Sequence, residues 1–160
     1  MPNQETPQRT PSFDWILWLK WILVSTLGWV AGLVLPAEVV IAIGTVMGFM
    51  QWIVLRSLMG EAGWWILATA VGWAVGQMVV NIVPLVGTVV VQGAVLGAVT
   101  GTMQWFVLRR WVYRAAWWIV MSTLGWAVGP VLGTSLVGAV VGAVTGFALE
   151  LLLRHARLEL

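Results

Sequence analysis

Gly-Phe-Met-Gln-Trp-Ile-Val-Leu-Arg (residues 48–56) closes the first of three similar segments of this chain. The same ending returns as Gly-Thr-Met-Gln-Trp-Phe-Val-Leu-Arg at 101–109, and in a weaker form as Gly-Phe-Ala-Leu-Glu-Leu-Leu-Leu-Arg at 146–154. The segments also share an opening, in which a Trp is followed seven residues later by a Gly-Trp step: Trp21 and Gly28-Trp29, Trp65 and Gly72-Trp73, Trp118 and Gly125-Trp126. Self-similarity of this kind predicts one supersecondary unit that is copied and stacked.

The composition of the chain indicates a membrane protein. Hydrophobic residues make up 61% of the sequence, charged residues 9%, and the mean hydropathy is +0.96. A soluble domain has about 25% charged residues, so this chain could not cover its apolar surface in water. The absence of cysteine excludes disulfides and cysteine metal sites. A net charge of +2 without a run of basic residues argues against nucleic acid as a partner.

Each segment contains two apolar stretches joined by a turn with Pro or Gly. Because an unpaired backbone amide is costly in lipid, we expect these stretches to be helical throughout. The predicted fold is an all-α integral membrane protein with six transmembrane helices, arranged as three repeated helical hairpins. The helices are expected at about 15–35, 38–56, 64–83, 86–110, 115–132 and 135–154.

The chain divides into a short tail and one membrane domain. Residues 1–12 are polar and Pro-rich and are expected to be a disordered cytoplasmic tail, whereas 13–160 form the membrane domain. Its hairpin repeats span about 13–56, 64–110 and 115–154. Counted from the repeat boundary, the first helices of repeats one and three have about 16 residues, or about 24 Å. They either thin the bilayer locally or stop short of the far side, since its hydrocarbon core is about 30 Å thick.

The basic residues predict the orientation. All eight Lys and Arg residues lie in the tail, in the two loops between hairpins, at the start of the first helix or after the last one. The turns at Pro36, Pro84 and Pro130 carry none. By the positive-inside rule, both termini are cytoplasmic, and a bacterial inner membrane is the expected location.

Glycines recur at every fourth residue of the predicted helices, a spacing that places them on one helix face. In lipid, such GxxxG stripes let helix backbones approach closely. We expect them to pack the six helices together, and the alternative is that some face outward to a partner or a flat ligand. The helix-packing glycines are Gly28, Gly32, Gly44, Gly48, Gly72, Gly76, Gly93, Gly97, Gly101, Gly125, Gly129, Gly138, Gly142 and Gly146.

A few polar residues fall at matching positions inside the spans and predict a polar layer. They are Ser25, Thr69 and Ser122 on the first helices of the repeats, and Gln51 and Gln104 on the second helices. In the third repeat, Leu149 takes the Gln position and Glu150 the adjacent Trp position, where we expect Glu150 to pair with Arg154. The layer provides either hydrogen bonds between helices or a site for a ligand or a pore. Gln77, Asn81 and Gln92, all in the longer middle hairpin, are the candidates for a permeation or binding site.

The 13 tryptophans are concentrated toward one side of the predicted bundle. Trp29, Trp73 and Trp126 lie deeper than the rest. We interpret the others as a one-sided interfacial belt, with packing against an aromatic or isoprenoid ligand or a neighbouring subunit as the alternative. Those predicted for the belt are Trp15, Trp18, Trp21, Trp52, Trp64, Trp65, Trp105, Trp111, Trp117 and Trp118.

No catalytic or metal site is predicted. His155 is the only histidine and is expected to be an ordinary interfacial residue, because one histidine cannot build a metal site or a catalytic triad alone. The glycines lack the following Lys-Ser and the strand of a phosphate-binding loop. We therefore expect that the protein is not an enzyme.

The elements Leu-Gly-Trp, Gly-x-x-x-Gly and Gln-Trp-x-Val-Leu-Arg (51–56 and 104–109) resemble those of a loose group of uncharacterised small multi-span membrane proteins of bacteria, including photosynthetic ones. The resemblance covers residues 20–154 and implies the fold, because no activity is attached to that group. The third copy keeps only the final Leu-Arg (153–154) of its most specific element. Tryptophan-rich sensory proteins, which bind porphyrins, are a poorer match, since they have five spans and Trp-Pro-rich elements that this chain lacks.

The sequence thus favours a non-catalytic accessory or scaffolding subunit of a larger membrane complex, and a photosynthetic or respiratory complex would fit. The alternatives are a small channel or carrier that uses the middle hairpin, and a protein that binds a pigment or quinone. No cofactor is required by the sequence, and a pigment, a quinone or a lipid are the candidate ligands. The expected partners are the lipid bilayer and other membrane subunits, without nucleic acid.

Overall fold

The computed structural model describes residues 12–35, 40–82 and 88–158. The chain is helical in these ranges, without any strand, which confirms the all-helical prediction. Its elements are α1 (Trp15–Leu33), α2 (Val40–Leu55), α3 (Trp64–Ile82), α4 (Val89–Leu108), α5 (Trp117–Val128), the short 3₁₀ helices η1 (Gly129–Leu132) and η2 (Thr134–Leu136), and α6 (Val137–Leu158). Most of the predicted tail and the turns at Pro36 and Pro84 lie outside the described residues.

Four segments are long and apolar enough to cross a membrane: Trp15–Leu33, Trp64–Ile82, Val89–Leu108 and Thr134–His155. This finding supports a membrane protein. The other two apolar helices, Ile41–Leu55 and Trp117–Leu132, are shorter.

The fifth predicted helix changes type before its end. It was expected over 115–132, but the α-helix stops at Val128 and continues as η1. Pro130 causes this change, because it has no N–H to donate to the α-helical ladder. Gly133 then reverses the chain with φ of +114°, a conformation that favours glycine. The 12 residues of α5 and the four of η1 together reach only about 26 Å.

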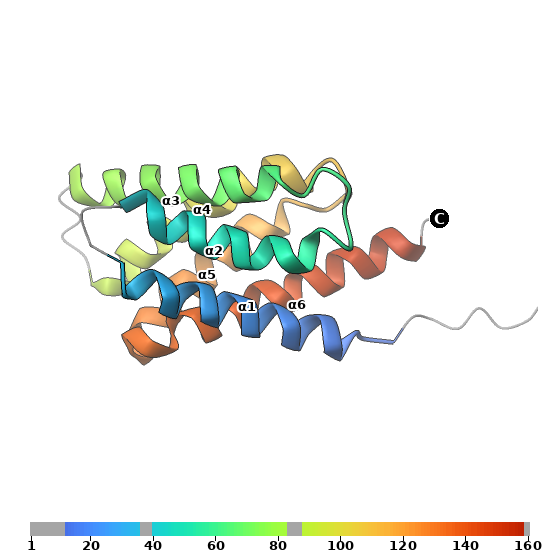
Figure 1. Ribbon diagram of the computed structural model, residues 1–160, viewed down its shortest axis with the longest axis horizontal. Coiled ribbons are helices and arrows are strands. Elements are labelled where there is room, and N and C mark those ends of the chain that lie inside the picture. Colours follow the sequence, from blue (N-terminus) through green and yellow to red (C-terminus); the bar gives the residue numbers. More distant parts are fainter. Residues whose placement is uncertain (1–11, 36–39, 83–87, 159–160) are drawn as a thin grey trace, which may run out of the picture.

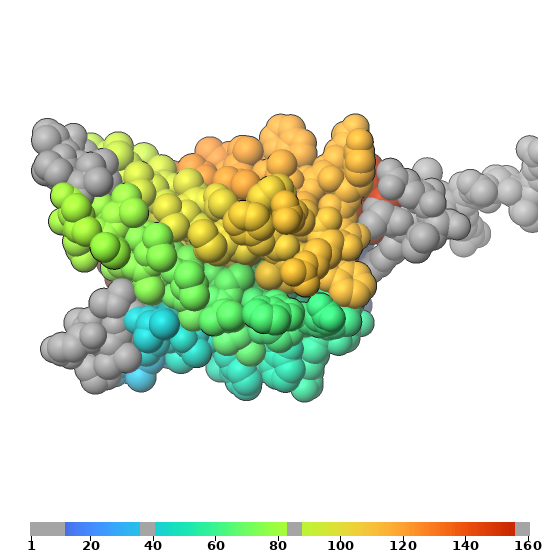
Figure 2. All heavy atoms as spheres, turned by 90° about the horizontal axis from the view of Figure 1, so that it is seen from above, coloured from blue at the N-terminus to red at the C-terminus, as the bar shows by residue number. Residues whose placement is uncertain are grey.

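The six α-helices form a closed ring. Each helix packs against the next one along the chain, and α6 packs against α1 as extensively as α2 packs against α3. Successive helices run in opposite directions (Figure 1). Figure 2 shows one outer face of the ring, on which α2, α3 and α4 lie side by side. The interior of the molecule is therefore the space enclosed by the six helices.

One end of the ring holds the start of α1, the loops 56–63 and 109–116, and the end of α6, and we call it the basic end (Figure 1). It takes this name from its arginines, which include Arg56, Arg109 and Arg114. Its two loops close the interior with the buried side chains Met59, Ala62, Val112 and Ala115. Glu61 and Arg110 connect the loops by an exposed ion pair of 3.4 Å.

The 14 glycines predicted to pack helices all lie against the next helix of the ring. A Cβ atom added to Gly28 on α1 would lie 2.9 Å from Met47 Cα on α2, and one added to Gly44 on α2 would lie 2.6 Å from Trp73 Cβ on α3. The last helix approaches the first helix in the same way, because a Cβ atom added to Gly138 on α6 would lie 2.6 Å from Trp29 Cβ on α1. The chain itself thus occupies the space beside every one of these glycines.

Candidate functional site: the layered core

Two layers of three tryptophans fill the interior of the ring. The first tryptophan layer, nearer the basic end, contains Trp21, Trp65 and Trp118, whose ring centroids lie 5.3 to 5.9 Å apart in edge-to-face contacts. The second tryptophan layer contains Trp29, Trp73 and Trp126, with centroids 5.2 to 5.9 Å apart. Each layer takes one tryptophan from each of α1, α3 and α5.

These six rings are buried, and the first layer is at most 1% exposed. The prediction of an interfacial belt is therefore wrong for Trp21, Trp65 and Trp118, whereas Trp15 and Trp64 are exposed as a belt requires. A signal in the sequence could have shown the difference. Trp, Ser or Thr, and Trp recur at positions i, i+4 and i+8 in all three odd-numbered helices, a spacing that places them on one helix face.

A polar layer lies between the tryptophan layers. Gln51 on α2 accepts a hydrogen bond from Trp65 Nε1 at 2.9 Å and donates one to Ser25 Oγ at 3.1 Å. Gln104 on α4 does the same one repeat later: it accepts from Trp118 Nε1 at 2.9 Å and donates to Thr69 Oγ1 at 3.0 Å. Each glutamine thus connects its own helix to both neighbours, and all of these side chains are buried.

In the third repeat, a threonine replaces the glutamine as the acceptor for the indole N–H of the first-layer tryptophan. Leu149 cannot accept a hydrogen bond, so Trp21 Nε1 donates instead to Thr145 Oγ1, one turn earlier on α6, at 3.0 Å. The Thr145 hydroxyl in turn donates to the carbonyl of Val141 at 2.6 Å. Ser122, the third hydroxyl of the predicted layer, is buried against Gly101.

The structure therefore brings together Ser25, Thr69, Ser122, Gln51 and Gln104 in one layer. The members of this layer are hydroxyls, amides and indoles, which donate and accept hydrogen bonds. None of them is the general base that a Ser or Thr hydroxyl needs in order to act as a nucleophile.

The space left inside the layered core is very small. A cavity of about 10 Å³ lies between the tryptophan layers, and Thr100 and Trp73 are among its lining residues. Thr100 Oγ1 and Trp73 Nε1 are buried and have no hydrogen-bond partner among the described residues. A volume near 10 Å³ is at the lower limit for a single water molecule. This cavity is therefore far too small for a pigment, a quinone or a file of ions.

Glu150 lies outside this layer, at the basic end of α6. Its side chain is 3% exposed, and its Oε1 accepts a hydrogen bond of 3.1 Å from the backbone N–H of Asp14, the N-cap residue of α1. The expected pair with Arg154 is wrong, because no Glu150–Arg154 contact within 4.0 Å occurs among the described side chains. Burial against α1 turns the carboxylate away from the helix surface, so that Glu150 links the first and last helices of the ring.

The amides of the middle hairpin stay apart from the layered core. Gln77 is half-buried, and Asn81 and Gln92 are exposed. His155 is exposed at the basic end of α6, and its Nδ1 donates a hydrogen bond of 2.7 Å to the carbonyl of Leu151 on the same helix. In the part of the chain that the structure describes, no three His, Cys, Asp or Glu side chains gather to hold a metal ion.

No protein-family model, curated protein or solved structure matches this chain.

Proposed function

We propose that this protein is a non-catalytic subunit of a larger membrane assembly, a small helical scaffold that other membrane proteins contact from outside. The observation that supports this role most is the filled interior. Its glutamines hydrogen-bond neighbouring helices, and six tryptophans occupy the axis of the ring. A protein built in this way offers its outer wall, and no central cavity, to other molecules.

The outer wall has the chemistry that contacts within a bilayer need. Every helix exposes large apolar side chains, such as Leu67 on α3, Leu124 on α5 and Phe147 on α6. Association between membrane proteins depends on van der Waals packing and shape, since lipid gives little hydrophobic driving force between helices. Exposed tryptophans at the basic end, Trp64 and Trp117 among them, add rigid contact area at the level of the lipid headgroups.

The proposal includes a repeated architecture and an orientation. We infer that three copies of one helical hairpin make the ring and that GxxxG contacts hold neighbouring helices together. The close approach of each glycine to the next helix supports this inference. We also infer that the basic end faces the cytoplasm of a bacterial cell, because the arginines of both inter-hairpin loops lie there.

A channel or carrier has less support from this geometry. Passage along the ring axis would require the displacement of both tryptophan layers, and the cavity between them measures about 10 Å³. Gln77 and Asn81 do not reach the polar layer of Gln51 and Gln104, so no continuous polar path connects them in the described part of the chain.

Purification in a mild detergent from the native membrane, followed by native mass spectrometry, tests the accessory role. We expect the chain to carry at least one other membrane polypeptide in a fixed stoichiometry. An unrelated tagged membrane protein, expressed at the same level, is the control, and only subunits absent from that control count. Recovery of the chain alone, as a monomer or a homo-oligomer, would contradict the proposal.

A further inference from the structure

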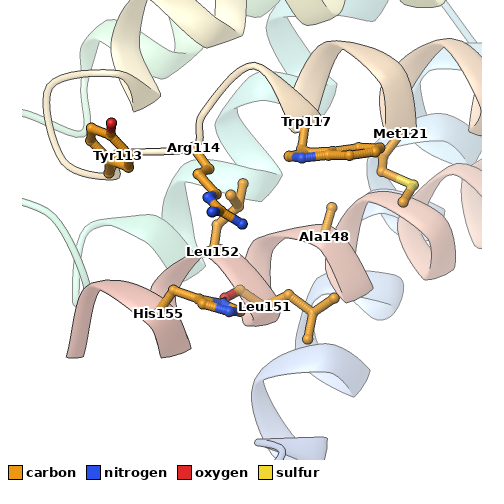
Figure 3. A pocket seen from close by; sticks show the side chains of 8 residues that line it. All are labelled: Tyr113, Arg114, Trp117, Met121, Ala148, Leu151, Leu152 and His155. Carbon is orange, nitrogen blue, oxygen red and sulfur yellow. The ribbon is translucent and has the colours of Figure 1, made fainter. Parts of the chain in front are cut away.

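A groove of about 580 Å³ lies between α5 and α6 at the basic end. This volume falls within the roughly 300 to 1,000 Å³ of small-molecule sites. Its walls are apolar, and Trp117, Met121 and Leu152 are among the side chains that form them (Figure 3). Arg114, from the loop before α5, and His155, from α6, line the same groove.

The other two hairpins carry grooves at corresponding places, and in each of them the basic residue of the lining has an acidic residue close by. The α3–α4 groove, about 260 Å³, is lined by Arg110, whose guanidinium pairs with Glu61 at 3.4 Å. The α1–α2 groove, about 350 Å³, is lined by both Asp14 and Lys20. Positive charge at these two grooves therefore has negative charge of the protein itself close by.

The third hairpin replaces this ion pair with two basic residues. Arg114 follows Glu61 by 53 residues, the same offset that separates Trp118 from Trp65. His155 follows Arg110 by 45 residues, the offset that separates Gly146 from Gly101. None of the residues that line the α5–α6 groove is acidic. The α5–α6 groove is the largest of these three grooves. Its two basic residues occupy the positions at which the α3–α4 hairpin has a salt bridge.

We propose that the α5–α6 groove binds one anionic phospholipid. Its phosphate contacts Arg114 and His155, and one acyl chain lies along Trp117, Met121 and Leu152. Guanidinium groups form strong charge-assisted hydrogen bonds with phosphate, and basic pockets between membrane helices bind anionic headgroups. The hydrogen bond from His155 Nδ1 to the carbonyl of Leu151 fixes the imidazole ring beside the groove.

The apolar walls favour a lipid over a free anion. Trp117 begins α5 and Met121 lies one turn further from the basic end, so the apolar surface continues away from the basic pair along the helix. A free phosphate would leave this surface without a partner, whereas an acyl chain covers it. Exposed Tyr113 beside the groove has the amphipathic character of residues at the lipid headgroup level. The proposal needs only a membrane location and does not depend on the accessory role.

Native mass spectrometry of the purified full chain tests the proposal. The delipidated protein is titrated with phosphatidylglycerol and, separately, with phosphatidylcholine of the same acyl chains. We expect one tight phosphatidylglycerol site that phosphatidylcholine fills at least about tenfold more weakly. Inorganic phosphate at millimolar concentration should not displace the lipid, and displacement would point to a free-anion site and overturn the proposal.

Two variants test the groove itself. Arg114→Glu with His155→Arg rebuilds the ion pair of the α3–α4 groove and should weaken phosphatidylglycerol binding at least about tenfold. Met121→Trp fills the apolar part and should weaken binding while both basic residues remain. Arg110→Gln, which removes a positive charge from the neighbouring groove, is the matched control and should bind as the wild type does. Far-UV circular dichroism verifies that each variant is folded. Equal binding by the rebuilt-pair variant and the wild type would overturn the proposal, and so would a polypeptide that occupies the groove.

Discussion

At the scale of single residues, the first tryptophan layer is organised by the need of its three buried indole N–H groups for acceptors. Gln51 and Gln104 meet this need for two tryptophans of the first layer, and Thr145 meets it for Trp21. The position of Thr145 holds Thr100 in the second repeat and Met47 in the first. Thr100 Oγ1 is buried without a partner, so only the first repeat lacks a second acceptor at this position.

Gln51→Leu should therefore cost more stability than Gln104→Leu. In the first case Trp65 Nε1 loses its acceptor beside Met47, and leaving that group unsatisfied costs about 1 to 3 kcal/mol. In the second case Trp118 can turn to Thr100, as Trp21 does to Thr145. Unfolding by SDS in mixed micelles measures both free energies.

The matched tests are a rescue and a control. Met47→Thr should recover at least part of the loss in Gln51→Leu, because it rebuilds the arrangement of the third repeat. Gln77→Leu should change the free energy of unfolding by less than either core variant, since Gln77 is half-buried outside the polar layer. Equal losses for Gln51→Leu and Gln77→Leu would contradict the assigned role of the layer.

At the scale of helices, one face of each element points into the ring and another approaches its successor. On α1 the inward face carries Trp21, Ser25 and Trp29, while Gly28 and Gly32 approach α2. The inward face needs large side chains that fill the interior, whereas the face toward the next helix needs glycines that let the two backbones approach closely. The repeat preserves both.

The sequence predicted the ranges of the helices better than it predicted which side chains face the interior. Four of the six helix ranges agree with the structure to within three residues at each end, and α5 and α6 differ by four residues at their C-terminal ends. The agreement arises because long apolar runs in lipid have no other way to satisfy their backbone. The polar layer was also predictable from its matching positions. The burial of the tryptophans was not read correctly, because hydrophobicity alone does not separate a side chain that faces lipid from one that faces the interior. The partner of Glu150 was predicted wrongly for a related reason: it is the backbone N–H of Asp14, the N-cap residue of α1, which is far away in the sequence.

Glycine substitutions should follow the measured approach distances. Gly44→Ala should destabilise the protein strongly, because its Cβ would lie 2.6 Å from Trp73 Cβ and 2.9 Å from the backbone oxygen of Thr69. Gly125→Ala should be milder, since the nearest atom, Val141 Cα, lies at 3.3 Å. Gly63→Ala, with no atom within 4 Å, is the control. Thermal unfolding in detergent would give the order, and an equal effect at all three sites would contradict it.

At the scale of the whole molecule, the ring is closed both around its circumference and along its axis. Contacts between α6 and α1 complete the circumference, and the tryptophan layers fill the axis. The basic end is covered by its own loops, which bury Met59 and Val112. The grooves of the three hairpins, in contrast, open on the outer wall of the described part of the chain.

Liposomes that contain the purified protein should be no more permeable to water, protons or potassium than protein-free liposomes. The reason is that the axis has no room for a hydrated ion between the tryptophan layers. Stopped-flow light scattering and a pH-sensitive dye measure these fluxes, with gramicidin as the positive control. Flux that scales with the amount of protein, and that Gln104→Leu abolishes, would revive the channel hypothesis.

Because the ring is closed, every helix has two neighbours, and none is distinguished by its contacts as the first or the last helix. The contact between α6 and α1 is built like the contacts between helices that follow one another in the chain, and α1 begins and α6 ends at the basic end. A circular permutant that starts at Trp64, with a short linker from the end of α6 to the start of α1, would retain every helix neighbour. It would also keep an even number of α-helices, so that its first helix would again begin, and its last helix end, at the basic end. The same structure would therefore form if the helices were synthesised in this different order.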